Sequence, residues 1–289
     1  MELVSRYNNF MGSTEKYEEA DTIIVGAPMD FTVSYRPGSR FGPQSIRNVS
    51  YVLEEYSVYL DRDLSDYRYY DWGDVNLPLG NVPASLDRIA GAAAQIVNDD
   101  KFPFFIGGEH LVSYPVIREV YKKYGNLVVI QLDAHADLRS DYLDEPNSHA
   151  TVMRKVCDLI GGKNLYQFGI RSGTSEEFAF AKANTNMYPL RVLEPLTDII
   201  PDIGARPVYI TIDIDVVDPA FAPGTGTVEP GGISSGELLK VVHAMGRLNV
   251  VGMDVVEIAP AFDQSERTAV LGAKVIRESI LGFTGARAK

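Results

Sequence analysis

The sequence predicts an α/β protein built on a mostly parallel sheet of about eight strands, with helices on both faces. Two observations carry this prediction. Continuous apolar runs, such as 127–132 and 208–212, are typical of strands that are buried on both faces. Between these runs lie segments in which apolar residues recur at helical spacing. Strands that alternate with helices along a chain indicate a parallel sheet covered on both sides.

In the first half of the chain, the apolar run 22–27 predicts the first strand. After a long loop rich in Pro, Gly and Arg, Gly42-Pro43 opens a helix, since proline is favoured at the first helical position. Its apolar face is expected to carry Ile46, Val49, Leu53 and Tyr56. Strands follow at 68–75 and 102–106, and helices are expected at 84–98 and 112–123.

In the second half, strand 127–133 precedes a long loop and a helix at 148–160, which Gly161-Gly162 ends. Ser234 and Glu237 have the spacing of a capping box at the start of another helix. The remaining strands are expected at 164–169, 187–192, 207–213 and 249–255. The remaining helices are expected at 175–183, 194–201, 234–246 and 266–280.

Composition narrows the classes of protein. The 289 residues show no repeat, low-complexity segment or long polar linker, so we expect a single domain over 1–289. A net charge of −12 without a Lys/Arg cluster argues against a nucleic-acid partner. No apolar stretch approaches the length of a membrane span, and no signal-peptide pattern is present. The single cysteine, Cys157, fits a reducing cytoplasm and a packing role on a helix.

Acidic and histidine residues gather where the predicted strands end. Three of them, Asp133, His135 and Asp137, follow the strand 127–132 at alternating positions, which places them on one face of an extended segment. Asp213 and Asp215 repeat this spacing after 208–212, and His110 follows 102–106. Ligands collect at the carboxyl ends of parallel strands. The sequence therefore predicts one polar site at this edge of the sheet.

The number of acids in this site indicates two metal ions. Four aspartates and two histidines are too many ligands for one ion, and uncompensated carboxylates repel each other when they lose water. Four aspartates contribute −4, and two divalent cations would neutralise that charge. Oxygen-rich ligands with one imidazole per metal favour Mn²⁺, with Fe²⁺, Co²⁺ and Zn²⁺ left open. Two ions roughly 3.5–4 Å apart could activate a bridging water.

These residues match a known family. The segments 107–110 (Gly-Gly-Glu-His), 133–137 (Asp-Ala-His-Ala-Asp) and 213–219 (Asp-Ile-Asp-Val-Val-Asp-Pro) resemble the three motifs of the ureohydrolases, which include arginases and agmatinases. The stretch 254–260 resembles the family's fourth segment. The stretches 28–30, 34–43 and 222–227, with Gly231-Gly232, make the chain most like the bacterial agmatinases. Glu109 departs from the aspartate usual in the family, at a position that is not a ligand.

The resemblance implies an arginase-like three-layer α/β/α fold and two Mn²⁺ ions per subunit. One metal would take His110, Asp133, Asp137 and Asp213, and the other would take Asp133, His135, Asp213 and Asp215. A metal-bridging hydroxide would attack the guanidinium carbon, and Asp137 would orient it. Glu257 would pair with the guanidinium, and His149 would both contact the substrate and shuttle protons. The family also implies a homotrimer or homohexamer.

Agmatine is the substrate that we expect, giving putrescine and urea. The loop between Asp137 and His149 carries Asp141, Asp144 and Glu145, which would repel a carboxylate and attract an ammonium group. Asp144 and Glu145 are therefore predicted substrate-binding residues. The alternatives are another guanidino-substrate ureohydrolase (guanidinobutyrase, arginase or formimidoylglutamase), a Zn-dependent acetylpolyamine deacetylase-like enzyme, which would need one metal, and a non-catalytic binding protein. His243, on a helix among apolar residues, is expected to be structural.

Overall fold

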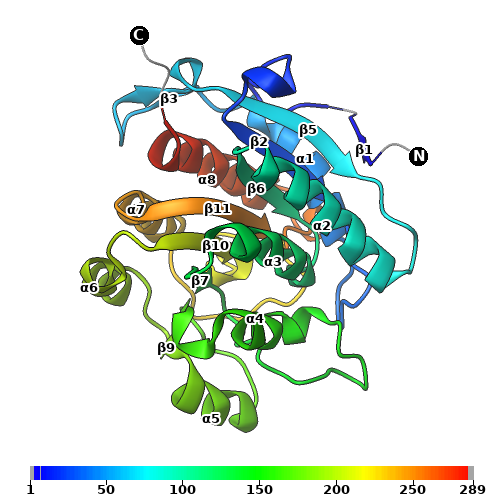
Figure 1. Ribbon diagram of the computed structural model, residues 1–289, viewed down its shortest axis with the longest axis vertical. Coiled ribbons are helices and arrows are strands. Elements are labelled where there is room, and N and C mark those ends of the chain that lie inside the picture. Colours follow the sequence, from blue (N-terminus) through cyan, green and yellow to red (C-terminus); the bar gives the residue numbers. More distant parts are fainter. Residues whose placement is uncertain (1–2, 7, 286–289) are drawn as a thin grey trace.

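A nine-stranded sheet forms the centre of the molecule in the computed structural model, which describes residues 3–6 and 8–285 (Figure 1). Eight of these strands run parallel to their neighbours, and the short β1 (Val4–Ser5) pairs antiparallel with β5 at one edge. The strand order is β1-β5-β2-β6-β11-β10-β7-β8-β9. The predicted parallel sheet of about eight strands is therefore confirmed.

The parallel strands lie close to the predicted ranges, except that the strand expected at 187–192 already ends at Tyr188. They are β2 (Thr22–Ala27), β5 (Tyr69–Val75), β6 (Phe102–Gly107), β7 (Val128–Leu132), β8 (Leu165–Phe168), β9 (Asn186–Tyr188), β10 (Pro207–Asp213) and β11 (Asn249–Val256). A small two-stranded ribbon of β3 (Tyr56–Ser57) and β4 (Arg62–Asp63) stands apart from this sheet.

Eight α-helices accompany the sheet in the described residues. They are α1 (Gly42–Ser50), α2 (Val82–Asn98), α3 (Ser113–Tyr124), α4 (Val152–Ile160), α5 (Ser175–Asn184), α6 (Leu193–Ile203), α7 (Ser235–Met245) and α8 (Arg267–Phe283). One prediction was wrong in length. The first helix stops at Ser50, and Tyr56 lies in β3 rather than on a continuing helical face.

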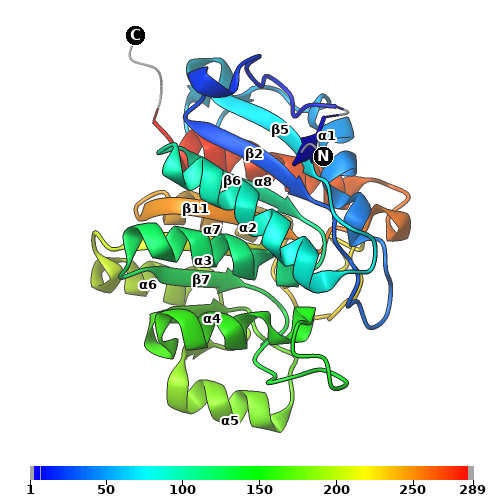
Figure 2. The same cartoon turned by 45° about the vertical axis from the view of Figure 1, so that its right-hand side comes forward.

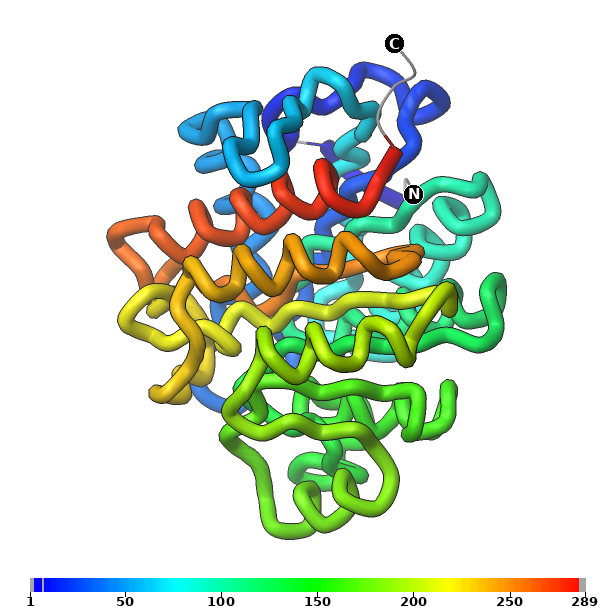
Figure 3. Tube along the Cα trace, turned by 90° about the vertical axis from the view of Figure 1, so that its left-hand side faces the viewer, coloured from blue at the N-terminus to red at the C-terminus, as the bar shows by residue number. Residues whose placement is uncertain are grey.

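Helices cover both faces of the sheet, so the fold has three layers. Helices α2, α3 and α4 lie on one face (Figure 2), and α6, α7 and α8 lie on the other (Figure 3). Strand residues divide between the two cores by alternation: Val128, Ile130 and Leu132 pack with the α7 and α8 side, whereas Val129 packs with α2 and α3. No described helix is long and apolar enough to cross a membrane.

Candidate active site

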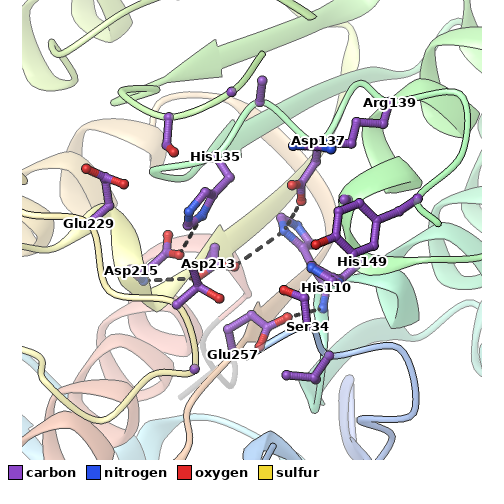
Figure 4. A pocket seen from close by; sticks show the side chains of 18 of the residues that line it. Ser34, His110, His135, Asp137, Arg139, His149, Asp213, Asp215, Glu229 and Glu257 are labelled. Carbon is purple, nitrogen blue, oxygen red and sulfur yellow. Dashed lines mark hydrogen bonds and ion pairs between the residues drawn. The ribbon is translucent and has the colours of Figure 1, made fainter. Parts of the chain in front are cut away.

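A pocket of about 290 Å³ lies where the carboxyl ends of β6, β7, β10 and β11 meet the loops that follow them. Figure 4 shows that most of the predicted site residues converge there, namely His110, His135, Asp137, His149, Asp213, Asp215 and Glu257. Ligands bind parallel sheets at this edge, because each strand is followed there by a loop that can carry polar side chains. The pocket thus lies at the edge of the sheet where the sequence places a polar site.

His110 lies at the centre of the first group of acids. It begins a 3₁₀ turn directly after β6, and its side chain is almost fully buried. Its Nδ1 atom lies 3.0 Å from Asp133 Oδ2, 3.2 Å from Asp137 Oδ2 and 3.5 Å from Asp213 Oδ2. This nitrogen makes no hydrogen bond of good geometry with any residue that the structure describes. A buried ring nitrogen without a hydrogen bond, surrounded by three carboxylates, is a metal-binding arrangement.

A second group forms around His135. Its Nδ1 atom lies 2.9 Å from Asp215 Oδ2 and 3.7 Å from Asp133 Oδ1. Asp133 therefore faces both histidines, one with each carboxylate oxygen. The backbone N–H of Ala134 donates to Asp215 Oδ1 (3.0 Å), which ties the β10 loop to the β7 loop. The two groups together form one continuous acid-histidine cluster.

The loop after β7 brings its three side chains together in a way that simple alternation does not describe. The strand ends at Leu132, and His135 makes an isolated bridge with Ser172. Asp137 adopts a left-handed backbone conformation with φ of 54°, which is uncommon outside glycine and asparagine. The expectation of one extended segment over 133–137 was therefore wrong in its local geometry. A turned loop converges the same three side chains.

The buried charges of the cluster shift the pKa values of its histidines and aspartates. Burial lowers the pKa of His110 and of His135, but their contacts with the surrounding aspartates raise both pKa values well above the usual value. Burial, followed by repulsion from Asp133, raises the pKa of Asp137 to about 7. Burial, followed by the charges of Asp215 and Asp133, raises the pKa of Asp213 well above its usual range. Bound cations would reverse these pKa shifts, because they stabilise ionised carboxylates and neutral imidazoles.

The donor set fits two metal ions. One triplet of ligand atoms from His110, Asp133 and Asp213, and a second from Asp133, His135 and Asp215, each lie within 4.8 Å of one another. The triplets share Asp133, as expected of a bridging carboxylate. Asp213 belongs to one triplet only, and Asp137 to neither, although Asp137 contacts His110 directly. Oxygen donors with one imidazole in each group suit hard or borderline divalent cations.

Glu257 and His149 line the same pocket. Glu257 follows β11 in a left-handed conformation, and its Oε1 accepts a hydrogen bond from the backbone N–H of His110 (2.8 Å). Burial, followed by the charge of Glu109, raises the pKa of Glu257 to about 8. His149 begins the 3₁₀ turn 149–151, and its backbone N–H donates to Thr32 Oγ1 (3.0 Å). Burial lowers the pKa of the His149 ring to about 4. The imidazole is thus neutral at pH 7.

Asp144 and Glu145 do not join the pocket. Both are exposed, and neither lines the cavity. The backbones of Tyr142 and Glu145 hydrogen-bond to each other in a tight turn, and the Glu145 carboxylate accepts from the N–H of Asn147. The turn projects these two acids into solvent. Their contact with the substrate stays a prediction, and the residues of this loop that line the pocket are Arg139 and Tyr142.

Sequence reasoning missed several polar residues that shape the site. Gln131 donates to Asp133 Oδ2 (2.7 Å), and its own oxygen accepts from Gln167 (2.6 Å). Thr211 contacts His110 from inside β10. The signal for these residues was available, since a glutamine or threonine within an otherwise apolar buried strand needs a hydrogen-bond partner. Glu229, a further pocket residue, lies in a loop and carried no such signal.

The fold and the site together define a class of protein. A parallel sheet covered on both faces, with four aspartates and two histidines converging at its carboxyl edge, is the architecture of a metal-dependent α/β hydrolase.

Comparison with known proteins places the chain within this class. Residues 20–282 match the arginase family model. The chain is 57% identical to the agmatinase of Bacillus subtilis (strain 168), over 95% of this chain and 96% of that protein. It is 54% identical to the agmatinase of Bacillus cereus, with the same coverage. The agmatine ureohydrolase of Thermoplasma volcanium superimposes with a TM-score of 0.87 at 31% identity, over 96% of this chain and 94% of that one. The chain belongs to the arginase family, and it is a ureohydrolase most like the bacterial agmatinases.

Proposed function

We propose that this enzyme hydrolyses the guanidinium group of agmatine to give urea and putrescine, with two Mn²⁺ ions per chain. The observation that carries the proposal is the convergence of five of the six expected ligands with Glu257 and His149 around one pocket, with the sixth, Asp133, buried against His110. Its support from relatives is the 50–57% identity to four bacterial agmatinases.

The ligands divide into two sets in this proposal. His110, Asp133, Asp137 and Asp213 hold one cation, and Asp133, His135, Asp213 and Asp215 hold the other. Bound together, the two cations would lower the pKa of a shared water and so supply the nucleophile. The shared position of Asp133 between the two histidines supports this division.

The remaining residues orient the substrate and move protons. The Asp137 carboxylate accepts a hydrogen bond from the attacking water and aims it at the guanidinium carbon. Glu257 pairs with the guanidinium through charge-assisted hydrogen bonds, which fixes that carbon in the pocket. His149 carries a proton to the departing amine, and its place at the pocket wall supports this role. Water adds to the carbon, the carbon–nitrogen bond to the amine breaks, and the amine leaves protonated.

Further features of the protein follow the family. We propose one ureohydrolase domain over residues 1–289, a location in the cytoplasm, and assembly as a homotrimer or homohexamer, which sedimentation of the purified protein would test. Its partner is a small cationic guanidino substrate rather than nucleic acid or membrane.

A substrate panel tests the function. Purified Mn²⁺-loaded protein is assayed with agmatine, arginine, 4-guanidinobutanoate and N-formimidoylglutamate, and urea or formamide is measured. We expect the highest kcat/KM with agmatine. Faster turnover of any of the other three would contradict the substrate assignment while leaving the ureohydrolase class intact.

A further inference from the structure

One acid in the pocket has no partner. The carboxylates that line the cavity belong to Asp137, Glu177, Asp213, Asp215, Glu229 and Glu257. The three aspartates contact the histidines, and Glu257 accepts from the backbone of His110. Within the described part of the chain, the Glu229 side chain makes no hydrogen bond or ion pair, although its residue is half-buried.

The pocket's sixth acid, Glu177, is already occupied. Its carboxylate accepts from the backbone N–H groups of Leu138 (2.9 Å) and Thr174 (2.9 Å), and it lies 3.4 Å from Arg139 Nε. Arg139 also stacks over the ring of Tyr142. It is the one Lys or Arg side chain that lines the pocket in the described residues. A terminal carboxylate on a substrate would therefore have to compete with Glu177 for Arg139. A terminal ammonium could instead pair with Glu229, which has no ion-pair partner among the described residues.

The backbone that carries Glu229 is held in place. Arg171 donates from Nε and Nη2 to the carbonyl oxygen of Glu229 (3.0 and 2.7 Å), and from Nη2 also to the carbonyl oxygen of Asp215. The Asp218 carboxylate accepts from the N–H groups of Gly231 and Gly232 just beyond. The backbone of Glu229 is thus fixed relative to that of Asp215, a residue of the acid-histidine cluster, which places the side chain at one position on the pocket wall.

Figure 4 shows Glu229 on the side of the cluster that carries His135 and Asp215, away from Arg139 and His149. We propose that Glu229 is the specificity residue that binds the primary ammonium at the far end of a diamine-derived guanidino substrate. This inference rests on the proposed function and adds to it the group that distinguishes agmatine from guanidino acids. An ion pair in a partly desolvated pocket strengthens binding most for the substrate that carries the second positive charge.

The test compares Glu229→Gln with the wild type on two substrates of similar shape. Agmatine ends in an ammonium group, and 1-pentylguanidine carries a methyl group in its place. We expect kcat/KM for agmatine to fall roughly 10- to 100-fold, mainly through KM, since a hydrogen bond to a charged group is lost. The kcat/KM for 1-pentylguanidine should change less than about 3-fold. Glu229→Asp keeps the charge and should recover part of the loss.

Asp198→Asn and Glu194→Gln are matched controls, because each removes one negative charge from an exposed acid outside the pocket. Both should keep agmatine kinetics near wild type, since exposed charges are screened. Equal losses of kcat/KM on both substrates, or no loss on agmatine, would overturn the role of Glu229. Urea release from agmatine by the wild type would still uphold the proposed function in that case. A wild type that does not hydrolyse agmatine would overturn both.

Discussion

The Thr211 hydroxyl lies 2.9 Å from the Nε2 atom of His110, on the ring nitrogen that points away from the acids. Thr211 in turn donates to Asp254 Oδ1 (2.6 Å), and Tyr209 donates to the other oxygen of the same carboxylate (2.7 Å). All of these groups are buried. Such a chain fixes the orientation of a ligand histidine and the nitrogen that it presents to a metal.

Thr211→Val should therefore weaken metal binding. The substitution keeps the shape of the side chain and removes the hydroxyl that holds His110. We expect Mn²⁺ affinity to fall roughly 10- to 100-fold, measured by titration against a chelating dye. Tyr209→Phe is the control, because it removes a hydrogen bond to Asp254 and leaves the contact between Thr211 and His110. Equal affinity in Thr211→Val and the wild type would show that Thr211 does not position the ligand.

Asp137→Asn should abolish turnover and preserve the fold. Asparagine tolerates the left-handed backbone at this position, where φ is 54°. The backbone carbonyl of Asp137 keeps its hydrogen bonds from Met153 and Arg154. The amide can neither ligate as a carboxylate nor accept in the same way from the attacking water, so we expect kcat to fall by roughly 10²- to 10⁴-fold. A melting temperature near that of the wild type would accompany this loss. An active Asp137→Asn enzyme would refute the role given to this residue.

His149 should make stability depend on pH between about 4 and 6.5. Burial lowers the pKa of the folded imidazole from 6.5 to about 4. In this window the unfolded chain binds the extra proton, so the free energy of unfolding rises with pH. The contribution is fully present above pH 6.5 and is lost as pH falls towards 4. It is roughly 1–3 kcal/mol, because the ring is partly exposed.

The pH effect is measured by urea unfolding of the metal-free protein at several pH values. His149→Gln should lose less stability than the wild type as the pH is lowered through this window. The acid-histidine cluster is common to both proteins, so its titration cancels in the difference except for its coupling to the His149 charge through His135 and His110. Parallel stability curves for the two proteins would mean that the His149 ring is not buried in its neutral form.

Gly108 should tolerate no side chain. A Cβ atom there would lie 1.9 Å from the backbone oxygen of Met29, in the turn that leads from β6 to His110. We expect Gly108→Ala to lower the free energy of unfolding by roughly 3 kcal/mol. Gly91→Ala is the matched control in α2, where nothing lies within 4 Å. It should stabilise the protein by about 0.5–1 kcal/mol. Chemical denaturation of both variants checks the pair, and similar effects would contradict the close approach at Gly108.

Local patterns were enough to predict most of the fold. The apolar runs at 22–27 and 207–213 coincide with β2 and β10 residue for residue, because strands buried on both faces leave an unbroken apolar sequence. The two-residue strands β1, β3 and β4 were not predicted, because runs this short carry no alternating pattern, and β1 also depends on a distant partner, since Ser5 pairs with Asp74. The helix that begins at Gly42 was predicted too long because Leu53 and Tyr56 keep a helical spacing outside any helix.

Some residues of the site could also be predicted from local patterns, and others could not. His110, Asp133 and Asp215 could be located because each lies within three residues of the end of a strand, and the sheet brings such ends together. Glu229 could not be found, since its position depends on contacts made by Arg171 from another loop. Asp144 and Glu145 were expected in the pocket from their charge alone, and a tight turn directs them into solvent. The charge of a loop residue predicts which ligands it could attract, but the backbone conformation of the loop determines whether its side chain points into the pocket.

The number of metal ions needed for activity tests the account most directly. Metal-free protein is titrated with Mn²⁺ while bound metal and urea release from agmatine are measured together. We predict two ions per chain at saturation and urea release that reaches its maximum only as the second ion binds. Full activity at one ion per chain, or two bound ions without urea from agmatine, would contradict the proposal of a binuclear agmatine hydrolase.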